Sequence, residues 1–91
     1  MVITDTRDAY DTACKKVNDA RINVRRAETD AVSAMMYKAQ VEADNDVAEK
    51  AKADSDFIVR YDAYVTALKS KETARGEANS VLAAYMKERV A

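Results

Sequence analysis

The chain has 91 residues, with 15 basic and 16 acidic side chains and a net charge of −1, so it is too short for several domains and too evenly charged to coat nucleic acid by bulk charge. Eighteen residues are Ala, one is Gly, and none is Pro, His or Trp. Because sheets need tight turns built with Gly or Pro, this composition argues against a β fold and favours a single all-α domain over residues 1–91.

An apolar heptad pattern predicts a long first helix over about residues 5–43. Its positions alternate in spacing between three and four residues: Tyr10, Ala13, Val17, Ala20, Val24, Ala27, Ala31, Ala34, Lys38 and Val41. Thr4 or Thr6 is expected to cap the start of this helix. The alanines allow a second helix to approach closely. A second apolar stripe joins between Ala31 and Val47, which predicts contact with more than one helix.

An acidic segment, over about residues 44–56, is expected to contain the turn. Residues 42–56 hold six acidic side chains and two lysines. Asp46 and Glu49 have the spacing of a helix-capping box, and the run 54–56 offers a second cap, so the chain should reverse at one of these two points. Residues 47–53 favour helix and either extend the first helix or form a short third one.

A second apolar pattern predicts a helix over about residues 57–90. It begins with Phe57, Tyr61, Tyr64 and Leu68, flanked by Ile58 and Val65, and resumes with Ala78, Val81, Leu82 and Tyr85. The stretch between them is polar, and Ser70 is a candidate start for a separate helix. Since a break usually brings a stronger stop signal, one continuous helix is favoured over two.

Two arms of similar length predict a long antiparallel helical hairpin with coiled-coil-like packing along the alanines. A turn within residues 44–55 pairs residues whose numbers add to about 98. Two helices alone cannot cover the wide apolar faces. We therefore expect the hairpin to associate with itself, as a dimer or a higher oligomer, into a helical bundle.

No pattern typical of a catalytic, metal or cofactor site is present. The missing His removes the commonest general base and metal ligand, and one Gly cannot build a phosphate-binding loop. We interpret Cys14 as a buried and unreactive side chain on the apolar stripe. The single cysteine and the lack of a signal-peptide pattern favour the cytoplasm, and the apolar runs are too short for a membrane span.

One charge pattern suggests a binding surface, which we call the basic belt. Residues 15–26 carry five basic side chains against one acid, and residues 57–75 carry four against two. In the predicted hairpin these segments lie side by side, near tyrosines, and the candidate residues are Arg21, Arg25, Arg26, Lys69, Lys71, Arg75, Tyr37, Tyr61 and Tyr64. Cations beside stacking rings are how proteins hold single-stranded nucleic acid. In the alternative interpretation, Glu28, Glu72 and Glu77 neutralise the arginines and the tyrosines belong to the core.

The sequence therefore leaves two hypotheses for function. The first is a non-catalytic, self-associating binding or adaptor protein that acts on a larger protein partner. The second is a protein that binds single-stranded DNA or RNA through the basic belt. Binding to phosphates weakens log-linearly with salt, which distinguishes the two.

Overall fold

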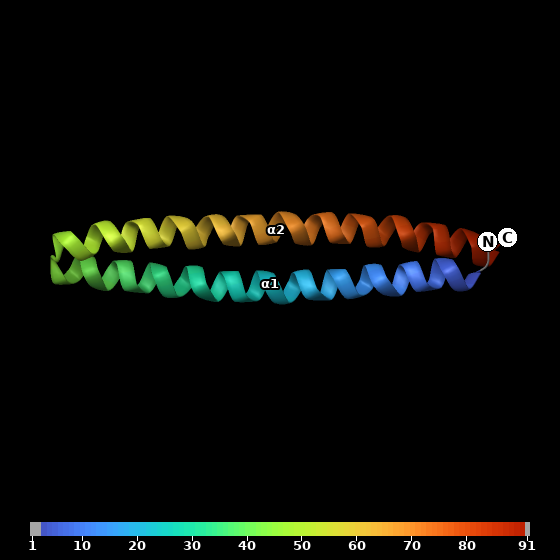
Figure 1. Cartoon of the computed structure of the whole chain (residues 1–91), viewed down its shortest axis with the longest axis horizontal. Helices are drawn as coiled ribbons and strands as arrows, with labels where there is room; N and C mark the ends of the chain where they lie inside the picture. Colours follow the sequence, from blue (N-terminus) through green and yellow to red (C-terminus); the bar gives the residue numbers. More distant parts are fainter. Residues whose placement is uncertain (1–2, 91) are drawn as a thin grey trace.

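The chain folds into two long helices that lie side by side and antiparallel (Figure 1). The computed structural model describes residues 3–90, and the side chains discussed below lie within residues 6–89. Helix α1 spans Ile3–Asp44 and helix α2 spans Val47–Val90, and the described part of the chain contains no strand. The hairpin measures 67 × 14 × 13 Å. The predicted all-α hairpin is confirmed.

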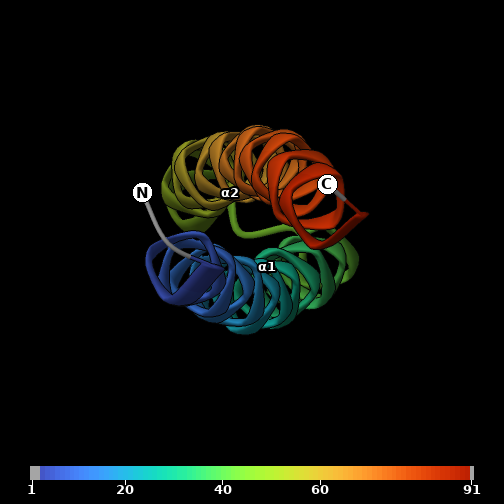
Figure 2. The same ribbon diagram turned by 90° about the vertical axis from the view of Figure 1, so that its right-hand side faces the viewer.

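The seam of α1 follows the predicted heptad. Each of its ten expected positions is buried or half-buried, and every other side chain from residue 7 to residue 44 is exposed. A seam with spacings of three and four residues makes helices wind around each other, as Figure 2 shows. Lys38 occupies a seam position because its ammonium group lies 3.5 Å from Asp54 and 5.3 Å from the centre of the Phe57 ring.

The seam of α2 differs from the predicted one. After Phe57 it passes through half-buried positions in which small and charged side chains are common: Tyr64, Ala67, Lys71, Ala74, Ala78, Val81, Tyr85 and Glu88. Tyr61, expected in the core, is exposed, and Leu68 is half-buried beside the seam. The alanine-rich seam of α1 allows close approach where the α2 seam is also small, at Ala67, Ala74 and Ala78, and Tyr61 and Leu68 lie beside the seam.

The turn is shorter than predicted, because it contains only Asn45 and Asp46. Asn45 has a φ of 58°, a left-handed conformation that Asn adopts more readily than most residues, and its N–H donates to the carbonyl of Glu42 at 3.2 Å. Asp46 caps α2 by accepting a hydrogen bond from the backbone N–H of Glu49 at 3.1 Å. The first of the two expected reversal points is therefore used.

Several expected boundaries are corrected by the two helix ranges. Residues 47–56, expected within the turn region, form the start of α2 because the Asp46 cap begins a helix with good helix formers behind it. No third helix occurs among residues 3–90. Thr4 and Thr6 do not cap α1, since that helix already includes Ile3. Helix α2 continues through Ser70, which confirms the continuous alternative.

The shorter turn also changes which residues face each other. The numbers of the ion-paired residues Lys38 and Asp54 add to 92, and those of Arg60 and Asp30 add to 90. Each residue of α1 therefore lies opposite one about six positions earlier in α2 than the predicted sum of about 98 implied. Arg21 lies at the level of Lys71, and Tyr37 lies nearer Ser55 than Tyr61.

The core of this hairpin is thin. Within residues 6–89 the buried apolar side chains are all Ala or Val: Ala13, Ala20, Val24, Ala31, Ala34, Val41 and Ala53. The chain exposes 6802 Å², whereas a compact monomer of 10.1 kDa exposes about 5,300 Å². Neither helix, within the described residues, has a segment apolar enough to cross a membrane.

Candidate functional site

The two flanks of the hairpin differ in chemistry. Since both seams repeat every seven residues, the side chains beside them fall on two opposite sides of the helix pair. One flank, which we call the apolar side, carries these exposed large hydrophobic residues: Val32, Met35, Ile58, Tyr61, Leu82 and Met86. The other flank, the polar side, carries mainly charged and hydrogen-bonding residues, which include Lys16, Asn23, Asp30, Tyr37, Asp56 and Glu77.

The apolar side is hollowed where α1 and α2 meet in their turn-proximal halves. The hollow has a volume of about 240 Å³, and it is lined by Glu28, Ala31, Val32, Met35, Phe57, Tyr61 and Tyr64. The Tyr61 ring lies 5.9 Å from the Phe57 ring and 6.4 Å from the Tyr64 ring, between centroids. Met35 is 51% exposed and Tyr61 is 49% exposed, so large apolar side chains of this hollow are in contact with water. Exposed apolar patches of this kind are typical of binding surfaces.

The polar side is held by a local network of charges. The Nε of Arg60 donates to both carboxylate oxygens of Asp56 at 3.0 Å, and its Nη1 lies 3.9 Å from Asp30. The hydrogen bond to Asp56 raises the pKa of Arg60. Tyr37 donates to Glu49 at 2.6 Å, and this bond raises the pKa of the phenol. These groups satisfy one another within the hairpin.

The basic belt is only partly assembled. The helical repeat and the observed register place Arg21, Arg25, Lys71 and Arg75 on the apolar side, together with Tyr61 and Tyr64. Arg26 lies on the polar side because it is one position, or about 100° of helix rotation, beyond Arg25.

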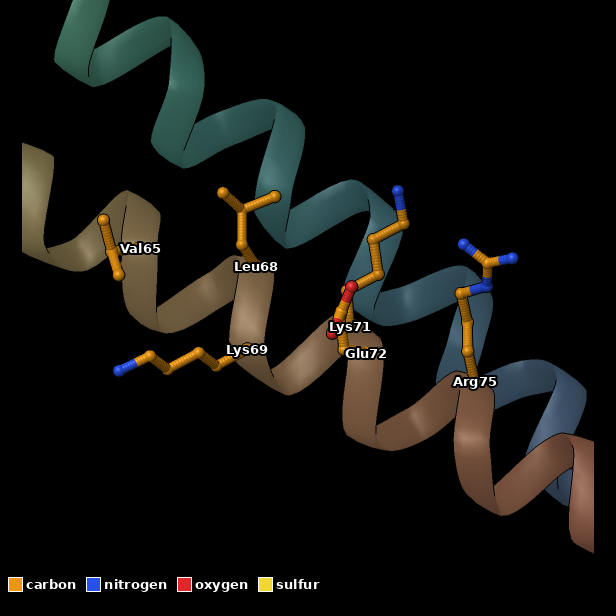
Figure 3. Close-up of a pocket in the computed structure, with 6 residues that line it drawn as sticks. All are labelled: Val65, Leu68, Lys69, Lys71, Glu72 and Arg75. Atoms are coloured by element: carbon orange, nitrogen blue, oxygen red, sulfur yellow. The ribbon is translucent and has the colours of Figure 1, made fainter.

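Two other candidate residues of the basic belt, Tyr37 and Lys69, lie apart from it for different reasons. Tyr37 lies on the polar side with its hydroxyl on Glu49, so it does not join the other tyrosines. Lys69 lines a hollow together with Lys71 and Arg75 but points away from α1 (Figure 3). The nine candidate residues therefore do not form one surface: their heptad positions place Arg26 and Tyr37 on the polar side, and Lys69 points away from α1.

A second hollow marks the basic part of the apolar side. It has a volume of about 250 Å³ and is lined by Val65, Leu68, Lys69, Lys71, Glu72 and Arg75. Figure 3 shows the side chains of Lys71 and Arg75 pointing toward α1. Arg21 and Arg25 project from α1 at the neighbouring levels, so cations from both helices gather in this region.

The alternative interpretation, in which acidic side chains neutralise these cations, has no ion pair to support it within residues 6–89. Within residues 6–89, ion pairs join carboxylates to Lys38, Lys52 and Arg60. None joins Glu28, Glu72 or Glu77 to a cation of the basic belt in that part of the chain. Arg21 and Lys71 lie level with each other, so their like charges repel, and Glu72 is the acidic side chain that lines the same hollow as Lys71.

Cys14, near the open end of the hairpin, is exposed, so the prediction that it is buried is wrong. Its side chain is exposed on the apolar side, beside a hollow that Tyr10, Val17 and Leu82 also line. Cys14 follows the seam residue Ala13, and that one step of helix rotation carries it out of the core. Its interaction with the Tyr10 hydroxyl raises the pKa of that phenol.

Sequence reasoning missed the contrast between the two flanks. The signal was present, since Val32, Met35, Ile58 and Tyr61 occupy equivalent places in the heptads of their own helices. Recognising this contrast requires the correct seam of α2. The sequence suggests a different seam, because Tyr61 and Leu68 are the more hydrophobic residues. Within the described residues no cluster of Cys, Asp or Glu is arranged to hold a metal ion. No family model matches the chain, and no curated protein or solved structure shows significant similarity to it.

Proposed function

We propose that this chain is a non-enzymatic binding protein: a hairpin that associates with itself through the apolar side and acts on a larger protein partner. The observation that carries the proposal is the gathering of large exposed apolar side chains on one flank, opposite a flank that is polar. Exposed apolar patches rimmed by polar residues are typical of protein–protein contacts.

Two further features support the same function. The buried residues are small, so the hairpin gains little from its own core, while its exposed surface exceeds that of a compact monomer. The composition also lacks the groups that catalysis commonly needs, because there is no His and only one Gly. Binding, in contrast, requires nothing beyond the surface itself.

The test compares two adjacent methionines. Met35 lies in the apolar hollow, whereas Met36 is 67% exposed and points away from α2. Sedimentation velocity at micromolar concentrations should show a dimer or higher oligomer for the wild type and for Met36→Glu, and a monomer for Met35→Glu. Glu favours helix, so circular dichroism should be similar for all three. A wild-type protein that sediments as one 10.1 kDa chain throughout would contradict self-association.

The larger partner is tested with the same pair of variants. Tagged wild-type protein and Met36→Glu should retain the same proteins from a host extract, and Met35→Glu should lose them. If all three retain the same proteins, the apolar side does not bind the partner.

A second candidate function is the binding of single-stranded nucleic acid. It is favoured by the unpaired cations Arg21, Arg25, Lys71 and Arg75, which lie on the same flank as Tyr61 and Tyr64. Fluorescence anisotropy with a labelled single strand should show affinity that falls log-linearly with salt. Arg25→Glu should weaken this binding and Arg26→Glu, on the polar side, should not. Absence of binding at low salt would eliminate this candidate.

A further inference from the structure

We infer that the apolar side receives a second copy of this chain, antiparallel to the first, with only the turn-proximal halves overlapping. The inference rests on the proposed self-association and specifies its geometry. In this arrangement a two-fold axis crosses the hairpin near Val32 and Met35, and each helix packs on its own symmetry mate. The product is a central four-helix bundle from which two open ends project in opposite directions.

The charges on the apolar side change in order from the open end to the turn. From the open end toward the turn, the cations Arg21 and Arg25 come first, then the apolar hollow, and then the acidic turn end. Of the six acids in residues 42–56, Glu42 lies on this side by its heptad position and lines a hollow at the turn with Asp46, whereas Asp56 lies on the polar side. The apolar patch therefore lies between regions of opposite charge, which is the arrangement that an antiparallel copy can match.

The spacing of these charges along α1 is self-complementary. The level midway between Val32 and Met35 is about eight residues from Arg25 and about eight from Glu42. It is also about twelve residues from both Arg21 and Asp46. Rotation about an axis at this level brings Arg25 of one copy to Glu42 of the other, and Arg21 to Asp46. Each contact occurs twice by symmetry.

The other face-to-face arrangements of two copies are disfavoured by their charges. In a parallel pair, with both turns at one end, the unpaired cations face the cations of the partner and the acidic turns face each other. In an antiparallel pair that overlaps along its whole length, the axis lies near residue 24 of α1, so Arg21 of one copy faces the level of Arg25 of the other. Both arrangements place like charges together, which costs binding free energy.

The contact area is adequate for a stable dimer. The overlap includes residues 21–46 of α1 and the facing part of α2, and 26 residues of helix are about 40 Å long at about 1.5 Å per residue. Two helices side by side are about 20 Å wide, so each copy contributes about 800 Å². Stable specific complexes bury about this area on each partner.

The decisive experiment mixes two singly substituted proteins. Arg25→Glu alone places a second carboxylate against Glu42 at both symmetric contacts, and Glu42→Arg alone places two guanidinium groups there. Each variant should dimerise at least about tenfold more weakly than the wild type. An equimolar mixture should recover much of the wild-type affinity, because each contact of the heterodimer joins a carboxylate to a guanidinium group: the two introduced side chains meet at one contact, and the unchanged Glu42 and Arg25 meet at the other. The double variant Arg25→Glu with Glu42→Arg likewise restores an opposite-charge pair at both contacts. Arg26→Glu, on the polar side, is the matched control and should dimerise normally.

Disulfide formation locates the two-fold axis independently. In a Cys14→Ser background, Met35→Cys should form a disulfide-linked dimer under mild oxidation and Met36→Cys should not. Cys14 of the wild type should remain unlinked, because about nineteen residues separate it from the axis and the two thiols are about 60 Å apart.

The outcomes separate this inference from the proposed function. If the wild type dimerises but the double variant recovers no affinity, or Met35→Cys does not cross-link, the antiparallel arrangement is wrong and self-association stands. If the wild type is monomeric, both fail. If the monomer instead binds a labelled single-stranded nucleic acid and Arg25→Glu abolishes that binding, the cations bind nucleic acid. The inference of an antiparallel dimer is then overturned.

Discussion

Alanine side chains set the distance between the two helices. Ala34 is 4% exposed, and it lies on the same seam as the equally small Ala20 and Ala31. Because protein interiors are packed densely, a larger side chain at such a position must displace the facing helix or leave its preferred rotamer. The same chemistry on the outer surface of α1 has no such consequence, since Ala43 is exposed.

Ala34→Leu should therefore destabilise the hairpin despite the high helix propensity of Leu. We expect a loss of about 1–3 kcal/mol in the free energy of unfolding, from overpacking. Urea unfolding followed by circular dichroism measures it. Ala43→Leu is the matched control and should remain within about 0.5 kcal/mol of the wild type. Equal effects at both positions would show that Ala34 is not at a close helix contact.

At the scale of the helices, α2 contains one weak residue for helix formation. Gly76 lies within the helix with a normal negative φ, and a methyl group added to it would meet no atom within 4 Å. Its place in the heptad is the outer surface, opposite the seam, which Ala83 occupies one repeat later. Gly there has an entropic cost and no packing benefit.

Gly76→Ala should raise the free energy of unfolding by about 0.5–1 kcal/mol, and Ala83→Gly should lower it by a similar amount. Thermal unfolding at a fixed protein concentration checks both. If Gly76→Ala is destabilising, the helix is distorted at this residue or a partner approaches its backbone there.

The seam of α1 could be predicted from sequence because its small apolar residues recur with little interruption. The seam of α2 could not, since Arg60 and Lys71 lie near it while Tyr61 and Leu68 lie beside it. Apolar spacing identifies the most hydrophobic stripe, whereas packing selects the stripe that fits an alanine-rich partner. The register was predicted too long because it depends on the turn, which the left-handed Asn45 makes two residues long. The side of the helix pair on which Arg26 and Tyr37 lie depends instead on their place in the heptad around the seam.

At the scale of the whole molecule, each helix contacts only the other, and no third element crosses them within the described residues. Stability is therefore distributed along the rod in successive heptads, as in proteins built from repeats. The turn holds one end of the seam together. At the opposite end, Thr6 donates to Glu88 and the Tyr10 and Tyr85 rings lie 6.0 Å apart. That end has no covalent link between the helices, so it should open more often.

Hydrogen exchange of backbone amides should follow this gradient. We expect the slowest exchange near Ala31 and Val41, where the seam is buried and close to the turn, and faster exchange near Ala13 and Val81. Mass spectrometry of short peptides from labelled protein resolves these regions. Uniform protection along both helices would show that the hairpin opens only by global unfolding.

The position of the two described ends, side by side and far from the turn, also determines how the molecule responds to tension (Figure 1). A pull that separates residue 3 from residue 90 acts across the seam at the open end, so it loads one heptad of contacts at a time. The helices would separate one heptad after another, from the open end toward Asn45, at modest force. A pull between the turn and the open end acts along the 67 Å rod instead and loads the backbone hydrogen bonds of the helices together. The same fold is therefore compliant in one direction and stiff in the other.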